Sequence, residues 1–283
     1  MSKENNLIFD EVPTSGPLAV PMTNDYLFKA MLQKNNKILK GLLCALLALK
    51  PEQIRSVQVT NPIELGESID DKTFILDVLL ILNDNSYYDL EMQVINEHNW
   101  VERSLSYLCR TYDNLCKGKN YVDVMPVHQI GILNYTLFPE NPEFYSEYGF
   151  VNRSTLQAYS DKIKLSVLDL TQIDLATEKD KENELDYWAR LFKSETWEEL
   201  QMLAEKDPIF KEVATQVKEL TDEEKIRMQC EAREDYYRTQ NDFHGYYLKQ
   251  LDEKDKTIDK KDKTIEELNK EIAKLQEELR MKQ

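Results

Sequence analysis

Two strand-like runs joined by three polar residues constrain the fold of this 283-residue chain more than any other feature. The first run, Phe74–Leu82 (FILDVLLIL), is almost entirely apolar, whereas polar and apolar residues alternate in the second, Tyr87–Ile95 (YYDLEMQVI). Between them lies Asn83-Asp84-Asn85, whose residues favour tight turns. The pattern predicts an antiparallel hairpin in which each strand presents alternate side chains to opposite faces.

The first run contains Asp77, a carboxylate that is hard to explain as an ordinary solvent-exposed residue among so many apolar neighbours. In the second run, Glu91 and Gln93 share one face. If the loop has three residues, Leu82 pairs with Ser86, and Asp77 then lies directly opposite Glu91. A two-residue loop would shift the register by one and send Glu91 to the other face, so a shared site requires an odd loop or a bulge.

Two neighbouring carboxylates repel each other and are costly to desolvate, so they persist where a cation offsets them. Mg²⁺ prefers oxygen ligands and keeps several waters, and Asp77, Glu91 and the backbone carbonyl of Met92 would supply half of its shell. Such an ion could activate water and neutralise charge on a phosphate. The alternative is that Asp89, Glu91 and Gln93 form the wet face of an edge strand. Asp77 is the residue that favours a metal or catalytic site.

The composition argues against several other classes of protein. The four cysteines form no CxxC pair and the three histidines are far apart, so neither a zinc site nor a disulfide framework is expected. Residues 1–20 lack the basic start and apolar core of a signal peptide. The most apolar helical stretch, Ile38–Leu49, is shorter than the roughly 20 residues that cross a bilayer. We therefore expect a cytoplasmic protein that does not interact with membranes.

The charge distribution is acidic, with a formal net charge of −16. The largest excess lies in residues 181–245, which carry 10 basic and 17 acidic residues. No segment is basic overall, so tight non-specific binding to nucleic acid by phosphate neutralisation is not indicated. This counts against a DNA-acting protein and has to be weighed against the hairpin carboxylates.

The remaining pattern divides the chain into four segments. Residues 1–20 form an irregular lead-in, residues 21–180 an α/β domain, residues 181–245 an acidic helical region and residues 246–283 a separate tail. Helices are expected from about Thr23-Asn24-Asp25, over Lys37–Leu49 and over Trp100–Lys117, and further strands at Ser56–Thr60, His128–Leu137 and Lys164–Leu170.

The tail carries a heptad repeat. Apolar residues recur every seven positions at Leu251, Ile258, Ile265, Ile272 and Leu279, with Leu268 and Leu275 at the intervening d positions. Lys254 and Lys261 occupy the first two d positions and weaken the early part of the seam. The spacing predicts a coiled coil that makes the protein a homo-oligomer through residues 246–283. The alternative is a single solvated helix that frays.

An Asp, a hairpin and then Glu-x-Gln resembles the core of PD-(D/E)XK nucleases, in the variant with Gln where Lys is usual. More narrowly, the chain is similar to the Rpn-type recombination-promoting nuclease/putative transposase family. The resemblance covers about residues 22–175, and its ordered set of motifs is more specific than a lone ExQ. The matching pieces are TNDYLFK at 23–29, LDV at 76–78, YYDLEMQV at 87–94, ERSLSYLCRTYDNLCKGKNY at 102–121 and PVHQIGILNY at 126–135.

The resemblance implies a restriction-endonuclease-like α/β fold, with a mixed central sheet flanked by helices, and hydrolysis of DNA that depends on Mg²⁺ or Mn²⁺. Asp77 and Glu91 match the metal-ligand carboxylates, and Gln93 matches the third polar residue of the catalytic motif. An amide can orient water but supplies no positive charge, so more of the electrostatic stabilisation would fall on the metal. Asp25 matches a further catalytic acid on the first helix, although it could equally cap that helix.

The same resemblance indicates residues that would contact nucleic acid. Arg103 and Tyr107 lie one helical turn apart and match the family's Arg-x-x-x-Tyr element, in which Arg103 could meet a phosphate. The alternative for Arg103 is an ion pair with an acid such as Asp113 or Glu102. Weaker candidates for phosphate contact are Arg110, Lys117 and Lys119, which a solvated helix end explains as well.

Two functions therefore follow from the sequence. The first is a metal-dependent DNA endonuclease of a recombination or transposase-like type. The second is a catalytically inactive nuclease-fold protein that binds or assembles through its coiled coil. The overall acidity, the Gln at position 93 and the long tail favour the second, whereas the hairpin carboxylates favour the first.

Overall fold

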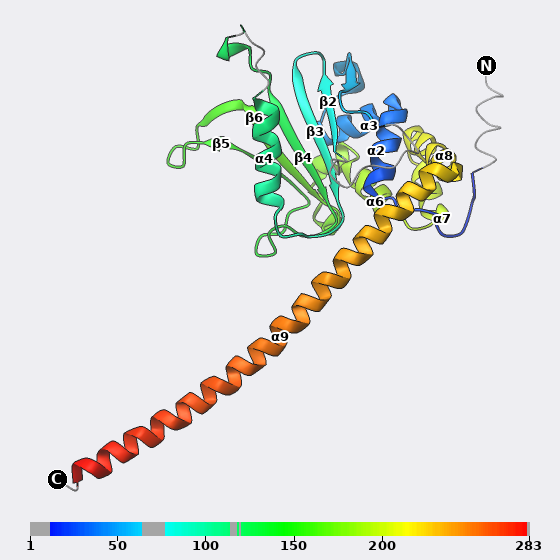
Figure 1. Cartoon of the computed structure of the whole chain (residues 1–283). Helices are drawn as coiled ribbons and strands as arrows, with labels where there is room; N and C mark the ends of the chain where they lie inside the picture. The colour runs from blue at the N-terminus through cyan, green and yellow to red at the C-terminus, as the bar shows by residue number, and fades with distance from the viewer. Residues whose placement is uncertain (1–11, 64–76, 114–117, 119, 282–283) are drawn as a thin grey trace, which may run out of the picture. The chain divides into compact units, whose positions relative to one another are not determined.

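The computed structural model describes residues 12–63, 77–113, 118 and 120–281. Within them, a six-stranded mixed sheet has the order β1-β2-β3-β4-β6-β5 (Figure 1). The β3–β4 and β4–β6 pairs are parallel and the others are antiparallel. This confirms the expected mixed sheet. The strands are β1 (Val57–Val59), β2 (Val78–Leu82), β3 (Ser86–Gln93), β4 (Val127–Leu133), β5 (Tyr145–Val151) and β6 (Ala158–Asp169).

The β2–β3 hairpin has the register expected for a three-residue loop, with Leu82 opposite Ser86 and Val78 opposite Leu90. Asn83 and Asp84 in the loop both have positive φ (52° and 58°), a conformation that Asn and Asp tolerate better than most residues. The Asn83 side chain also accepts a hydrogen bond from the Arg55 backbone N–H at 2.7 Å. The turn chemistry therefore fixes the register on which the site depends.

Strand β3 lies inside the sheet, between β2 and β4, so the alternative of an exposed edge strand is wrong. Asp89, Glu91 and Gln93 are only 1%, 5% and 9% exposed. They are buried because β4 extends the sheet beside them and helix α4 (Trp100–Tyr112) covers the same face across β4 and β6. Buried polar groups of this kind require specific partners.

The opposite face of the hairpin packs into the main hydrophobic core. Helices α2 (Asp25–Lys34) and α3 (Asn36–Leu47) lie on this side of the sheet (Figure 1), and α2 contacts β2 and β3. The hairpin residues that point into this core are Val78, Leu80, Leu82, Leu90 and Met92. One face of the hairpin is thus structural and the other carries the polar residues, as the alternating pattern of the second run predicts.

The close approach of α4 to the sheet depends on Gly131 in β4, which lies opposite Glu91. A Cβ added at Gly131 would lie 2.1 Å from the ring of Trp100, the first residue of α4. Only glycine leaves room for the indole at this point. The contact brings α4, and with it Arg103, down onto the face that contains Glu91.

The acidic segment folds into helices that share the core of the sheet domain. They are α5 (Glu178–Glu182), α6 (Leu185–Lys193), α7 (Trp197–Ala204) and α8 (Pro208–Asp222). Apolar residues of α6, α7 and α8 pack with those of α2 and α3, because each helix buries one apolar stripe and leaves its charges outside. The described residues up to Glu234 form one compact unit, which extends past the expected boundary at residue 180.

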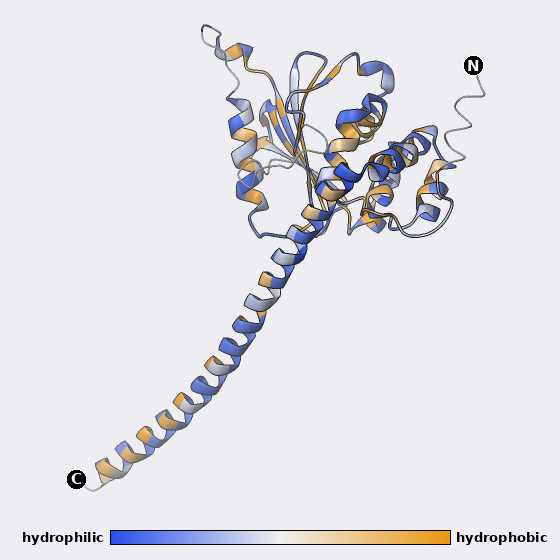
Figure 2. Ribbon diagram, turned by 45° about the vertical axis from the view of Figure 1, so that its right-hand side comes forward, coloured by the Kyte–Doolittle hydropathy of each residue, from blue (hydrophilic) through white to orange (hydrophobic). Residues whose placement is uncertain are grey.

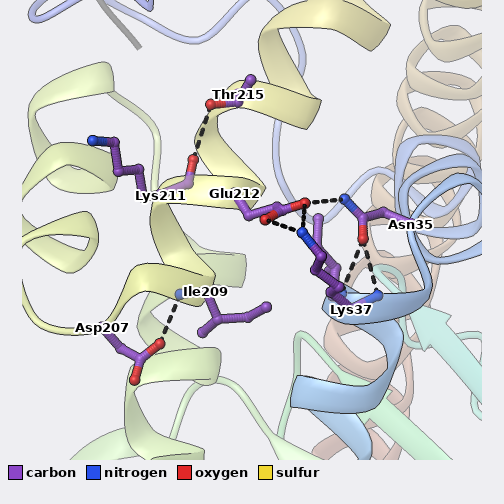
Figure 3. Close-up of polar contacts among 8 residues, drawn as sticks. Asn35, Lys37, Asp207, Ile209, Lys211, Glu212 and Thr215 are labelled. Carbon is purple, nitrogen blue, oxygen red and sulfur yellow. Dashed lines mark hydrogen bonds and ion pairs between the residues drawn. The ribbon is translucent and has the colours of Figure 1, made fainter. Parts of the chain in front are cut away.

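Polar contacts join α8 to the junction between α2 and α3 (Figure 3). Glu212 accepts hydrogen bonds from the Asn35 amide and from the Lys37 ammonium, both at 3.2 Å. Asp207 caps α8 by accepting from the backbone N–H of Ile209 at 2.7 Å. These contacts attach the helical segment to the part of the chain that carries the hairpin's covering helices.

The last helix, α9 (Glu224–Met281), has 58 residues. Its first turns bury Ile226 and Cys230 in the core, whereas residues Asp235–Gln283 form a second unit. Apolar residues recur along this second unit (Figure 2), and the apolar heptad residues from Leu251 to Leu279 are all more than half exposed. The long helix is confirmed, and its assembly into a coiled coil stays a prediction.

The described residues also contain the short 3₁₀ turns η1 (Pro51–Gln53), η2 (Tyr121–Asp123) and η3 (Ile173–Leu175). Strand β5 was not expected from the sequence, because it is an exposed edge strand whose residues show no regular alternation of burial. Among the described residues, none of the helices combines the length and the apolar character needed to cross a bilayer.

Candidate active site

Asp77 and Glu91 lie on the same face of the hairpin. Asp77 directly precedes β2, so continuing the register from the Val78–Leu90 pair places it opposite Glu91. Both side chains are buried, at 7% and 5% exposure, and the charge of Asp77 contributes to raising the pKa of Glu91. The Asn61 amide donates to the Asp77 carboxylate at 3.4 Å and to its backbone carbonyl at 3.1 Å. The sequence therefore placed this pair correctly.

Glu91 forms an ion pair with Arg103 of α4, whose Nε donates to Oε1 at 2.8 Å. The alternative for Arg103, an ion pair with an acid, is therefore what the structure shows, but the partner is Glu91 and not Asp113 or Glu102, because α4 turns Arg103 toward the sheet. The guanidinium also lies over the Tyr107 ring, 5.1 Å from its centroid. Burial raises the pKa of Glu91 to about 7, although Arg103 lowers it. Glu91 is thus poised between its charged and neutral forms.

A third carboxylate, Asp89, belongs to the same cluster and is only 1% exposed. Burial raises the pKa of Asp89 well above its usual range, and Asp77 and Glu91 raise it further, partly through a hydrogen bond with Asp77. Sequence reasoning placed Asp89 on the face of Glu91 but gave it no role. Strand alternation was the signal, since residues 89 and 91 point the same way. We call Asp77, Asp89 and Glu91 the carboxylate cluster.

The cluster has a buried lysine beside it that sequence reasoning did not assign to the site. Lys29 of α2 is 1% exposed. Burial lowers the pKa of Lys29, whereas the nearby carboxylates of Asp77 and Asp89 raise it. Lysines are almost never fully buried unless they are paired. The only feature of the sequence that pointed to Lys29 was its place in the TNDYLFK motif. Lys29 adds a positive charge to the site, which the neutral amide of Gln93 does not.

Gln93 lies at the end of β3, where Tyr135 reaches it from the segment after β4. The Tyr135 hydroxyl donates to Oε1 of Gln93 at 2.9 Å. Because β3 and β4 are parallel, their carboxyl ends meet at one edge of the sheet. Burial raises the pKa of Tyr135, and so does the charge of Glu91, so this hydroxyl keeps its proton. Tyr135 is a second site residue that the sequence did not single out.

Asp25 does not cap α2, because the N-cap is Asn24, whose side chain accepts from the Leu27 backbone N–H at 3.1 Å. Instead, both carboxylate oxygens of Asp25 accept hydrogen bonds from Arg233 of α9, from Nε at 2.9 Å and from Nη2. Asp25 still lies close enough to raise the pKa of Glu91. The carboxylate of Asp25, which was predicted to be catalytic, is thus already bound by Arg233.

The sequence also predicted site roles for Arg110, Met92, Lys117 and Lys119. Arg110 is exposed, with its guanidinium 5.8 Å from the centroid of the Tyr107 ring. Met92 directs its side chain into the main core, which leaves only its backbone carbonyl as a possible ligand. Lys117 and Lys119 lie outside the described residues.

The donor set fits a hard divalent cation. Oδ1 of Asp89 and Oε2 of Glu91 are buried and have no hydrogen-bond partner, and such oxygens are what Mg²⁺ prefers. Within the described part of the chain, no three or more His, Cys, Asp or Glu side chains are grouped as a metal site. Glu91 thus offers Oε2 to a cation held with Asp77, Asp89 offers a further oxygen, and a backbone oxygen and water would complete the shell, since Mg²⁺ usually keeps several waters.

Comparison with known families decides the relationship. A family model described as PD-(D/E)XK nuclease family transposase matches residues 22–246. The chain belongs to this family. Members of curated protein collections and solved structures gave no match. The match reaches beyond the sheet domain, includes α5 to α8, and continues into α9 past Glu234, where the first compact unit ends.

Proposed function

We propose that the protein is a metal-dependent endonuclease that hydrolyses phosphodiester bonds of DNA with Mg²⁺ or Mn²⁺, in a recombination or transposase-like role. The observation that carries this proposal is the buried pair Asp77 and Glu91, opposite each other on the hairpin with Lys29 beside them. Membership of a nuclease family supports it. Carboxylates and a lysine buried together have a high cost in stability, which favours a functional reason for keeping them.

Asp77, Glu91 and the carbonyl of Met92 would hold the metal. When bound, the cation would lower the pKa of a water and neutralise charge that builds on the phosphate. Glu91 can act as a metal ligand because Arg103 opposes the effect of burial and keeps part of this carboxyl group ionised near neutral pH. The ion pair with Arg103 uses only Oε1, so Oε2 is the oxygen available to a ligand.

Gln93 would orient the attacking water. Its Oε1 already accepts a hydrogen bond from Tyr135, which fixes the orientation of the amide, and a carbonyl oxygen has a second lone pair for a water proton. The amide cannot supply positive charge, so the stabilisation that a lysine at position 93 would give has to come from elsewhere.

Lys29 is the residue that supplies this charge. It reaches the carboxylate cluster from α2 and not from β3, next to Asp77 and Asp89. Arg103 adds a second cation on the other helix that borders the cluster. These two side chains would offer positive charge to a phosphate bound beside the cluster, whereas the acidic excess of the chain is greatest in residues 181–245. The net negative charge of the whole chain therefore does not describe the local charge at the site.

The test is cleavage of supercoiled plasmid in Mg²⁺ or Mn²⁺ by the wild-type protein and by Asp77→Asn. We expect nicking by the wild type and about a 100-fold slower rate in Asp77→Asn. Asp84→Asn is the matched control, because it removes the same charge from the exposed tip of the same hairpin. Equal nicking by the wild type and Asp77→Asn, or none by either, would remove the enzymatic proposal.

A second candidate is a nuclease-fold protein that binds or assembles without cleaving. The exposed heptad residues of α9 favour it, since a seam of that kind normally packs against another helix. In that case the wild type would form oligomers and fail to nick DNA, and the family fold would serve only as a scaffold.

A further inference from the structure

The first turns of α9 attach to the beginning of α2 through four side chains. Arg233 donates to both oxygens of Asp25, and the Asn24 amide donates to the Cys230 carbonyl at 3.0 Å and to Oε1 of Glu234 at 2.7 Å. The side chains of Arg233 and Asp25 are only 11% and 7% exposed. A two-pronged guanidinium–carboxylate contact of this kind has strict geometry, so it fixes the position of Asp25.

Asp25 is also one helical turn before Lys29. Residues four apart face the same side of a helix, and an acid before a base at this spacing forms a favourable ion pair. Lys29 therefore has an acid one turn before it on its own helix, Asp25, while its ammonium interacts with Asp77 and Asp89 of the hairpin. Which of these acids binds the ammonium more strongly depends on how much of the charge of Asp25 is already compensated.

We infer that Arg233 is a positioning residue that binds Asp25 and thereby directs Lys29 toward the carboxylate cluster. This inference rests on the proposed function, because Lys29 matters only if the cluster is a reaction site. Without Arg233, Asp25 is a buried acid with Lys29 as the nearest cation on its helix. The ammonium then moves toward Asp25 and away from Asp77 and Asp89. Asp25 acts through Arg233 and Lys29, and does not contact the metal.

Mn²⁺ affinity and plasmid nicking should change in opposite directions in Arg233→Met, whereas an unfolded site would lose both. In Arg233→Met, the cluster loses the ammonium that competes with a cation, so Mn²⁺ binds more tightly. The same loss removes positive charge from the phosphate position, so plasmid nicking falls by about tenfold or more. In Asp25→Asn combined with Arg233→Met, no acid remains to attract Lys29. Both quantities then return to within about threefold of the wild type, a non-additive outcome that marks coupled residues.

Mn²⁺ affinity is measured by titration calorimetry and nicking on supercoiled plasmid, with thermal melting as the check on folding. Arg238→Met is the matched control, since it removes an exposed arginine that pairs with Asp235 further along the same helix. It should leave both quantities unchanged.

Three results would overturn the inference. Arg233→Met could leave affinity and nicking unchanged, or lose both together. The double variant could also stay as impaired as the single one, which would show that Asp25 itself is needed. A wild type that binds Mn²⁺ but does not nick would remove the proposed function alone, because the change in affinity still tests the position of Lys29. A wild type that neither binds nor nicks would remove both.

Discussion

Arg103 of α4 and Glu91 of β3 are joined by a hydrogen bond of 2.8 Å, although α4 packs mainly against the neighbouring strands β4 and β6. The contact exists because Gly131 lets the Trp100 ring lie against β4. It controls the protonation of Glu91, since burial raises the pKa of this residue and Arg103 opposes the increase.

Removing Arg103 should therefore make metal binding more sensitive to protons. In Arg103→Met the pKa of Glu91 rises above about 7, so at neutral pH more of the residue is protonated and unable to bind a cation. We expect weaker Mn²⁺ binding near neutral pH that recovers in alkali, followed by calorimetry between about pH 6 and 9. Arg110→Met, one helical turn beyond Tyr107, is the control. An unaltered pH profile in Arg103→Met would contradict the assigned role.

The stability of the metal-free protein should fall as pH rises from about 4.5 to about 7. Below the lower value Glu91 is protonated in both the folded and unfolded states, whereas between the two values folding requires a proton that the unfolded chain gives up. The shift corresponds to about 3 kcal/mol of unfolding free energy. In Glu91→Gln, the unfolding free energy measured by urea denaturation should not show this part of the decline with pH. A parallel decline in both proteins would assign the pH dependence to other groups, such as Asp89.

Lys29→Met should separate binding from chemistry. Loss of the ammonium beside Asp77 and Asp89 leaves the cluster more negative, so Mn²⁺ affinity is retained or increased. Nicking should fall by about 100-fold, the usual effect of removing one electrostatic group from a reaction site. The comparison is Lys34→Met, an exposed lysine in the last turn of the same helix. Full activity in Lys29→Met would exclude it from the reaction.

Gly131→Ala should weaken both the fold and the site. The new methyl group would lie 2.1 Å from the Trp100 ring, so α4 has to move away from the sheet. Overpacking of this kind typically costs about 1–3 kcal/mol, measurable by urea denaturation. Gly149→Ala, on edge strand β5, is the control because nothing lies within 4 Å of its added Cβ. Equal stability of the two variants would show that α4 accommodates the methyl group freely.

Deletion of residues 246–283 should lower the mass measured by light scattering. The heptad residues that this deletion removes are more than half exposed, and their burial against another copy would drive association. A point-mutant pair gives a finer comparison. Ile265→Asp disrupts an a position of the seam, whereas Lys263→Asp changes a position on the outer face. A tail deletion with unchanged mass would reject assembly through this segment.

The sequence was most informative where backbone geometry is local. The turn residues at 83–85 determined the register of the hairpin, and the register in turn brought Asp77 and Glu91 together. Strand alternation also placed Asp89 and Gln93 on the correct face. What it could not show was whether that face was wet or buried, because burial depends on β4 and α4, which come later in the chain.

Lys29 and Arg233 were missed for a different reason. Helix α2 is buried along Asp25–Leu32 on nearly every side, so it has no polar face against which a lone lysine would stand out. Arg233 lies 208 residues from Asp25, and no spacing rule connects positions so far apart. Contacts of this kind arise from packing, whereas sequence patterns report periodicity.

The turn of the hairpin lies at the far end of β2 and β3 from the carboxylates. Asp77 is five residues from Leu82, which at about 3.3 Å per residue corresponds to about 16 Å. The exposed tip is therefore a natural place for a reporter, for example a dye at residue 85. Such a label would test by fluorescence whether DNA binds to the protein, at a distance from the residues of the proposed site.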